Sequence, residues 1–282
     1  MKDFQGGAIQ APAQRIHYTL RIASAMCFIG HGAFGIITKP IWCNYFAVFG
    51  IGHDLAYRLM PLLGTVDILL GLSLLIYPLR AVAGWLVGWG LITATMRPLS
   101  GEPIGELIER AGNYGAPLAL LFLSKPSSRG LASWWSKIDA RPHPDGQTLT
   151  RVIGCLRVAV FLLLLGHGWL NWIEKKGLLQ QYAGLGFSNP IKTAHIVGIF
   201  EMLSAIALLI KPVRPLLLAL FLWKMGTELF YPHWELFEWV ERGGSYGCLL
   251  ALWLALDKTP AKAGFRSNSN SSSSSTSTAM AG

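Results

Sequence analysis

Apolar residues along the chain gather into long runs that are separated by short polar segments. A helix needs roughly 20 residues to cross a hydrocarbon core about 30 Å thick. Eight runs close to this length can be drawn, at residues 18–37, 58–77, 80–97, 108–124, 152–172, 192–210, 213–231 and 240–256. A lone strand in lipid would leave backbone groups unpaired, so each run predicts a helix. The pattern therefore predicts an all-α integral membrane protein with eight transmembrane helices.

The composition agrees with a membrane location. Of the 282 residues, 52% are hydrophobic and only 14% are charged, whereas an average soluble domain carries roughly 25% charged residues. This excludes a disordered chain, a disulfide scaffold and an ordinary soluble enzyme. The net charge of +9 does not indicate nucleic-acid binding, because the basic residues lie between the apolar runs and not in one stripe. The four cysteines form no metal-ligand spacing, so no metal site is expected.

The two halves of the chain repeat each other. Three motifs recur in the same order: a Leu-Arg pair followed by Gly-His-Gly, an acidic residue in the second helix, and Glu-Arg-x-Gly-x-Tyr-Gly. They lie at residues 20–32, 67 and 109–115 of the first half and at residues 156–168, 201 and 241–247 of the second. Matching motifs with only small changes in spacing indicate a duplication.

The repeat predicts a topology. Each half contains four predicted helices, and an even number returns the chain to the side on which it started. The halves are therefore expected to be parallel four-helix repeats, related by a pseudo-two-fold axis along the membrane normal. Most of the 24 Lys and Arg residues lie on the side of the N-terminus. The positive-inside rule then places both termini in the cytoplasm. The expected location is the inner (cytoplasmic) membrane.

Five regions are expected along the chain. They are a cytoplasmic N-terminus (1–17), a first membrane repeat (18–124), a cytoplasmic or interfacial linker (125–150), a second membrane repeat (151–257) and a disordered cytoplasmic tail (258–282). The linker is polar and rich in Pro and Ser. The tail is a low-complexity Ser-rich segment that lacks the apolar residues of a packed core.

Ionisable residues inside the predicted helices are the first candidates for catalysis. His31 and His167 lie past the midplane, and each could form an interhelical hydrogen bond, carry protons for a quinone or ligate a haem. The flanking glycines would let a helix or a flat ligand approach closely. Asp67 and Glu201 lie near the midplane as either proton-transfer groups or structural partners of His and Arg.

The Glu-Arg-x-Gly-x-Tyr-Gly motif contains the candidate substrate-binding residues. Arg110 and Arg242 could bind an anionic head group or an oxyanion from the outer face. Tyr114 and Tyr246, one turn further in, could donate a hydrogen bond to a quinone carbonyl. The alternative is a helix start at which Glu complements the helix dipole and Tyr anchors at the interface.

One pair of residues distinguishes the halves. Lys224 and Glu228 are four residues apart in the second half, where the first half has Gly90 and Ala94. Such a pair usually neutralises itself inside a bundle. If only one half is active, this difference favours the second.

With these motifs the chain resembles a tandem duplication of the DoxX-like superfamily, which are small four-helix membrane proteins. The family includes subunits of thiosulfate:quinone oxidoreductase. The resemblance rests on the Leu-Arg and Gly-His-Gly motif, the acidic residue of the second helix and the Pro-x-Arg before the third. It covers residues 15–124 and 150–257. It implies a redox-linked component, a subunit of a quinone-linked oxidoreductase, that delivers electrons to membrane quinone.

In that interpretation His31 or His167 moves protons, and Arg110 or Arg242 meets an oxyanion at the outer face. A quinone is the first candidate for the cofactor and a haem the second, because the chain has no nucleotide loop, Fe–S cysteine set or CxxCH. The expected partners are the lipid bilayer and either further subunits or an outer-face redox protein. One alternative is a non-catalytic structural or assembly subunit of a larger membrane complex. A small-solute transporter with two repeats ranks third.

Overall fold

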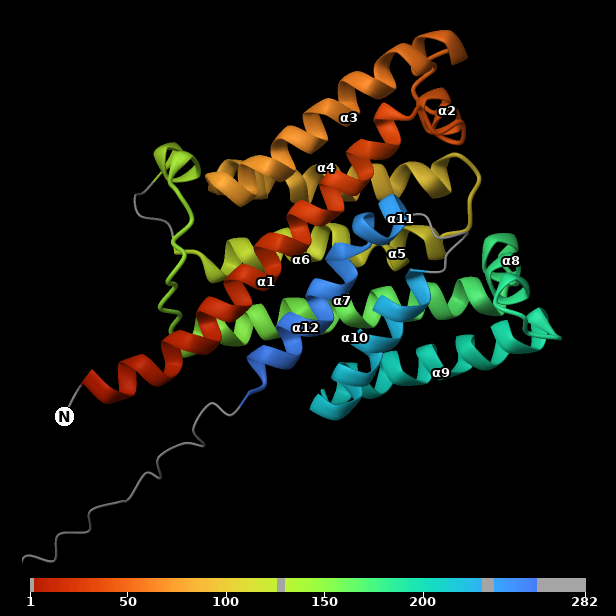
Figure 1. Cartoon of the computed structure of the whole chain (residues 1–282). Coiled ribbons are helices and arrows are strands. Elements are labelled where there is room, and N and C mark those ends of the chain that lie inside the picture. The colour runs from red at the N-terminus through yellow and green to blue at the C-terminus, as the bar shows by residue number, and fades with distance from the viewer. Residues whose placement is uncertain (1–2, 126–129, 230–235, 258–282) are drawn as a thin grey trace, which may run out of the picture.

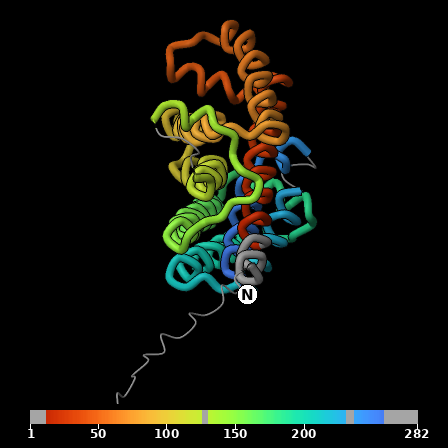
Figure 2. The backbone as a smooth tube through the Cα atoms, turned by 90° about the vertical axis from the view of Figure 1, so that its left-hand side faces the viewer, coloured from red at the N-terminus to blue at the C-terminus, as the bar shows by residue number. Residues whose placement is uncertain are grey.

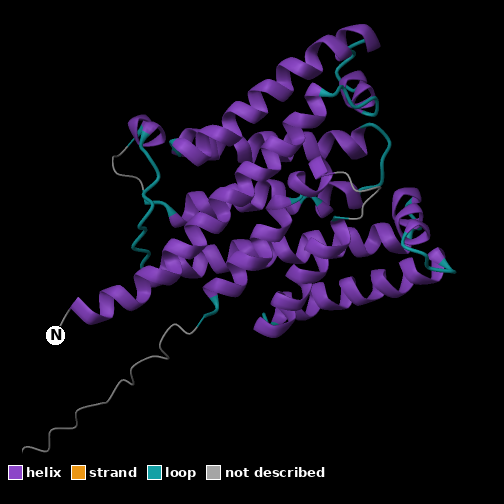
Figure 3. Cartoon of the chain, in the orientation of Figure 1, coloured by secondary structure: helices purple, strands orange, loops and turns teal. Residues whose placement is uncertain are grey.

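The computed structural model describes residues 3–125, 130–229 and 236–257, and in these segments every regular element is a helix (Figure 3). One isolated antiparallel bridge joins Leu79 to Lys137. The predicted all-helical fold is confirmed. The predicted tail at residues 258–282 lies outside the described residues.

Helices occupy all eight predicted segments. In the first half they are α1 (Asp3–Ile36), α3 (His53–Ile76), α4 (Arg80–Leu99) and the pair α5 (Gly105–Glu109) and α6 (Ala111–Leu123). In the second half they are α7 (Gly146–Trp172), α9 (Pro190–Ile210), α10 (Arg214–Glu228) and the pair α11 (Leu236–Glu241) and α12 (Gly243–Ala255). Three short elements were not predicted: α2 (Trp42–Ala47), the 3-10 helix η1 (Leu131–Trp135) and α8 (Lys176–Gly184).

Among the residues that the structure describes, four helices are long and apolar enough to cross a membrane, namely α1 from Pro12, α3, α7 and α9. The outer sides of α3 and α9 carry exposed large apolar side chains. The most exposed are Leu62, Leu69 and Ile76 on α3 and Ile196, Leu203 and Ile210 on α9. Water would penalise such a surface, whereas lipid does not. The protein is therefore a helical membrane protein, and its apolar helices place it in a bilayer.

Helices from the two halves meet in the middle of the molecule. In Figure 1 the helices α1, α12, α6 and α7 form the middle, with α3 and α4 on one side and α9 and α10 on the other. Figure 2 shows the same order from top to bottom. The contacts come in equivalent pairs, because α1 packs on α3 and α12 while α7 packs on α9 and α6. The last helix of each half thus packs on the first helix of the other half.

Glycines allow the closest of these contacts. A Cβ atom on Gly168 would lie 2.8 Å from the carbonyl oxygen of Gly198, so α7 and α9 meet backbone to backbone. Gly32 and Gly64 make the equivalent contact between α1 and α3. Small residues of this kind are what permit close helix packing in membranes. The second glycine of each Gly-His-Gly motif is therefore a packing residue.

The arginine of each Leu-Arg pair closes a helix end. Arg21 donates from Nε to the carbonyl oxygen of Leu74 at 2.5 Å, which satisfies an acceptor at the end of α3. Arg157 does the same at the end of α9, donating to Leu209 and Ile210. Free carbonyl groups at a helix end need such donors. This motif residue thus has a structural explanation in both halves.

The described part of the linker packs against the first half. The backbone N–H of Ile138 donates to the carbonyl oxygen of Pro78 at 2.8 Å. Trp134 covers Gly84 on α4, and its ring lies 6.0 Å from the guanidinium of Arg80. The linker and the N-terminus lie at one end of the bundle, whereas α2, α5, α8 and α11 lie at the other (Figure 1).

Candidate functional site

In the first half a histidine and a carboxylate join two helices. Nδ1 of His31 on α1 lies 2.7 Å from Oδ2 of Asp67 on α3. The Asp67 side chain is buried, and the His31 ring lies against Trp42 of α2 with 4.6 Å between centroids. Because Nδ1 faces the carboxylate, Nε2 is the nitrogen that remains for a ligand. Both residues were predicted, and the structure brings them together.

The second half repeats this pair. Nδ1 of His167 on α7 forms a hydrogen bond with Oε2 of Glu201 on α9. Asn171 joins the pair through its side-chain amide, and Tyr182 donates to the Asn171 oxygen at 2.7 Å. The other ring nitrogen, Nε2, lies 3.8 Å from a carboxylate oxygen of Glu228. A haem iron at Nε2 would need the place that Glu228 occupies.

Next to His31 the first half contains a cavity of about 300 Å³. Its walls come from α1 to α4 with their connections, the α5–α6 junction and one residue of α11. Most of the lining is aromatic or aliphatic: Trp42, Tyr45, Phe46, Phe49, Ile51, Leu59, Leu62, Leu63, Trp89, Ile92 and Met96. The polar lining is His31, Thr93, Arg97, Arg110, Asn113 and Glu241. An apolar pocket with a few polar groups is typical of a site for a small amphiphilic molecule.

Two buried charged residues distinguish the surroundings of the histidine in the second half. Beside His167, Nζ of Lys224 lies 2.6 Å from Oε1 of Glu228, and both side chains are buried. The first half has Gly90 and Ala94 at these positions, and neither has side-chain atoms that could reach the histidine. The described cavity lies in the first half, whereas the sequence favoured the second as the active one.

Ion pairs across the two halves surround the site. Lys39 lies 3.1 Å from Glu238, and at the equivalent place Lys175 lies 2.6 Å from Glu106. In each pair the lysine follows the Gly-His-Gly motif of one half, while the glutamate precedes the Glu-Arg motif of the other. We did not predict these four residues. Their matching positions in the two halves were the available signal.

The charge network lowers the pKa of its carboxyl groups. Burial alone would raise the pKa of the Glu238 carboxyl, but Arg242 and Lys39 outweigh it and hold the pKa at about 2. At Glu106 burial likewise raises the pKa of the carboxyl, but Arg110 and Lys175 lower it by more, so the pKa is lowered overall. Both carboxyls are therefore ionised at neutral pH.

The predicted arginines lie inside this network. Arg110 donates to Glu106 at 2.6 Å and to Glu109 at 3.2 Å. Arg242 donates to Glu109 at 2.5 Å and lies 2.9 Å from Glu228. An anion at either guanidinium would have to displace a carboxylate. The oxyanion role stays a prediction, and Arg110 alone of the two lines the large cavity.

The predicted tyrosines lie apart from the large cavity. Tyr114 donates to the carbonyl oxygen of Leu107 at 3.4 Å. Tyr246 is buried against Trp239, with 5.7 Å between ring centroids. Neither hydroxyl borders the cavity, so their proposed contact with a ligand stays a prediction.

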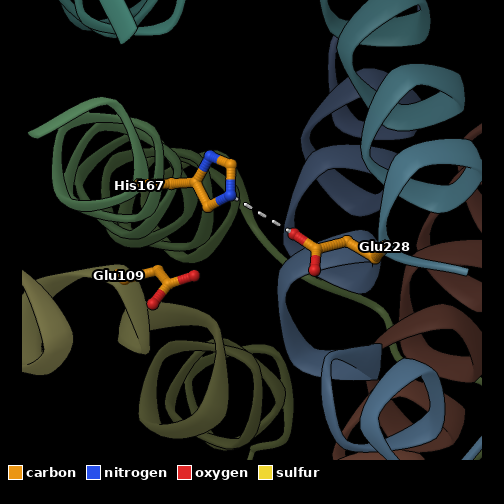
Figure 4. A group of neighbouring side chains, drawn as sticks. All are labelled: Glu109, His167 and Glu228. Carbon is orange, nitrogen blue, oxygen red and sulfur yellow. Dashed lines mark ion pairs between the residues drawn. The ribbon is translucent and has the colours of Figure 1, made fainter. Parts of the chain in front are cut away.

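One further group has the composition of a metal site. Glu109, His167 and Glu228 offer ligand atoms within 4.8 Å of one another (Figure 4). However, both carboxylates already face the guanidinium of Arg242, and Lys224 lies against Glu228. These two cations neutralise the charge that a metal ion would need. The geometry therefore favours an ion-pair cluster over a metal centre.

Comparison with protein-family models, curated proteins and solved structures finds no match for this chain. The resemblance to the DoxX-like superfamily therefore rests on the sequence motifs.

Proposed function

We propose that the chain is a DoxX-like inner-membrane protein that binds a quinone next to His31 and takes part in its reduction. The observation that carries this proposal is the cavity, which is apolar along most of its wall and borders the His31 ring. A quinone has this combination of a flat polar head and an apolar tail. The His31–Asp67 pair supplies a group that can exchange a proton with the head.

The proposed topology is eight transmembrane helices in two parallel repeats, with both termini in the cytoplasm. Equivalent contacts of α1 and α7, and equivalent pairs His31–Asp67 and His167–Glu201, support the repeat. The site then lies in the outer half of the membrane. The protein is thereby a redox-linked component that passes electrons from an outer-face donor to the quinone pool.

The chemistry needs two electrons and two protons for each quinone reduced to quinol. The electrons come from a reduced donor, which the family resemblance implies is a sulfur oxyanion. His31 gives a proton from Nε2 to a quinone oxygen, and Asp67 holds the ring orientation through Nδ1. The mostly apolar wall strengthens the hydrogen bond to the ligand.

The first experiment is quinone binding by the purified protein in lipid nanodiscs. Decylubiquinone should quench tryptophan fluorescence, because Trp42 and Trp89 line the cavity. Mass spectrometry of an organic extract should find about one quinone per chain when the protein is purified gently from native membranes. Absence of both signals would contradict the proposal.

A pair of equivalent variants tests the location. Thr93→Phe places a ring in the cavity and should weaken decylubiquinone binding about tenfold or more. Thr227→Phe is the matched control, because Thr227 occupies the equivalent position on α10 and does not line the cavity. Equal affinities of the two variants would contradict a site in the first half.

A non-catalytic subunit of a larger membrane complex is the second candidate. The buried charges of the second half favour it, since Lys224 and Glu228 of α10 lie against Glu201 of α9 and against Arg242 and so join helices. Co-purification with partner subunits in fixed ratio, together with no bound quinone, would support this function instead.

A further inference from the structure

One wall residue of the first-half cavity comes from the second half of the chain. Glu241, the last residue of α11, borders the cavity, and α11 packs against α1. The contact depends on Gly30, since a Cβ atom there would lie 2.7 Å from the Cα of Glu241 and 2.8 Å from the Phe237 carbonyl oxygen. Because Gly30 precedes His31, this contact brings Glu241 close to His31.

The equivalent residue in the other half is differently paired. Glu109 packs against Gly166 as Glu241 packs against Gly30, but its carboxylate lies 2.5 Å from Arg242 and 3.2 Å from Arg110. The Glu241 side chain is only 6% exposed, and it has no ion pair or side-chain hydrogen bond with the described residues. A buried carboxylate without a partner is costly, whereas a protonated carboxyl can donate to a ligand.

A second, smaller cavity lies behind Glu241. It has a volume of about 10 Å³, and its lining is polar throughout. That volume is about enough for one water molecule, which needs two to four polar partners. Arg110, Asn113 and Glu241 line both cavities. Glu241 therefore separates the ligand space from a water-sized space inside the charged network.

We infer that Glu241 is the second proton-exchanging group of the quinone site, so that one ligand is held by His31 from the first half and Glu241 from the second. The inference rests on the proposed function. Protonated Glu241 donates a hydrogen bond to a quinone carbonyl oxygen and transfers this proton to it when the two electrons of the reduced donor reach the quinone, while His31 gives the other proton. The carboxylate then takes a new proton from a water molecule in the small cavity. Asp67 holds the His31 ring, while the small cavity holds the proton source of Glu241.

Several charged or titratable groups surround Glu241. They are Cys27 and His31 on α1, Arg97 on α4, Glu109 and Arg110 at the α5–α6 junction, and Glu238 and Arg242 beside Glu241 itself. Both guanidiniums are already bonded to other carboxylates. The ligand and a water molecule are then the partners that remain for Glu241.

Carbodiimide labelling of the wild-type protein tests the inference directly. Dicyclohexylcarbodiimide is apolar, and a protonated carboxyl adds across its C=N bond and rearranges to a stable N-acylurea. Mass spectrometry should find the label on Glu241 and not on Glu109, which is ion-paired. Decylubiquinone should protect Glu241 from the label. Labelling of both residues alike, no label on Glu241, or label without protection would overturn the inference.

The variant Glu241→Gln gives a second measurement. E241Q keeps a hydrogen-bond donor beside the cavity and should bind decylubiquinone about as tightly as the wild type. Glu241→Leu removes the donor and should weaken binding roughly tenfold, because one hydrogen bond to the ligand is lost. Equal affinities of E241Q and E241L would overturn the inference.

The two proposals can fail separately. If the wild type binds quinone but the labelling and the Glu241 variants do not behave as expected, only the inference is overturned and the proposed function stands. Absence of quinone binding to the wild type overturns the proposed function, and the inference fails with it.

Discussion

The two halves of this protein share a scaffold but differ in what they place beside the histidine. Both halves pack a Gly-His-Gly helix against an acidic helix, and both pair the histidine with the acid. In the first half the space beyond the ring is a cavity of about 300 Å³. In the second half the buried Lys224–Glu228 pair lies beside the histidine.

The comparison also separates the roles of equivalent carboxyls. Glu109 binds Arg242 and so helps to join the halves, whereas Glu241 faces the cavity without an ionic partner among the described residues. A duplicated scaffold can therefore keep its packing while one copy supplies stability and the other supplies a site. The following variants test this division, in order of decreasing effect.

Removal of the buried lysine should have the largest effect. Lys224→Met leaves Glu228 and Glu201 without a nearby ammonium group and should lower the free energy of unfolding by about 3 kcal/mol. Unfolding of the purified protein in mixed micelles, followed by circular dichroism, measures the change. The double variant K224M/E228Q removes both charges and should recover part of the loss. A double variant as unstable as the sum of the single changes would contradict the ionic core.

Substitution of the first glycine of each Gly-His-Gly motif should have the next-largest effect on stability. Gly166→Ala forces a methyl group against the backbone of Glu109, and the strain should cost about 2 kcal/mol. Gly30→Ala should cost a similar amount and also displace Glu241 from the first-half cavity. Gly154→Ala on α7 is the control, because its Cβ atom meets open space and alanine favours a helix. Equal stability of G166A and G154A would disprove the close contact.

Removal of a lysine from an ion pair between the halves should have the smallest effect on stability. Lys39→Met removes the partner of Glu238 and should cost about 1 kcal/mol at neutral pH, since the lysine is one-third exposed. Lys175→Met is the equivalent change in the other half. Because the pKa of Glu238 is about 2 in the folded protein and ordinarily 4.5, its contribution to stability is present above pH 4.5.

That contribution is lost as the pH falls through about 2, when Glu238 becomes protonated in the folded state as well. In K39M the carboxyl is held less strongly, so the loss of stability in acid should be smaller than in the wild type. Thermal unfolding at a series of acidic pH values measures this difference. Parallel curves for K39M and wild type would show that Lys39 does not hold the Glu238 charge.

The sequence by itself determined the helices and the histidine–acid pairs. Helix positions follow from apolar runs, which are local, and the pairs follow from motifs that recur at matching places in both halves. The exact ends of the helices were harder to predict. The fourth predicted helix of each half breaks at an arginine, and the side chain of that arginine is bonded to neighbouring carboxylates. The glycines beside each histidine were expected to allow close approach, and they do.

Only the tertiary structure decided which half holds the cavity and which residues cross between the halves. Lys39 and Glu238 are 199 residues apart, and Glu241 reaches the first-half cavity because α11 packs on α1. Spacing along the chain does not encode such contacts, since each helix could pack on several others. Lys224 and Glu228 seemed in the sequence to mark an active half, but in the structure they are buried in ion pairs with Glu201 and Arg242. The volume beside each histidine depends on side chains from several helices, and their arrangement is a property of the folded bundle.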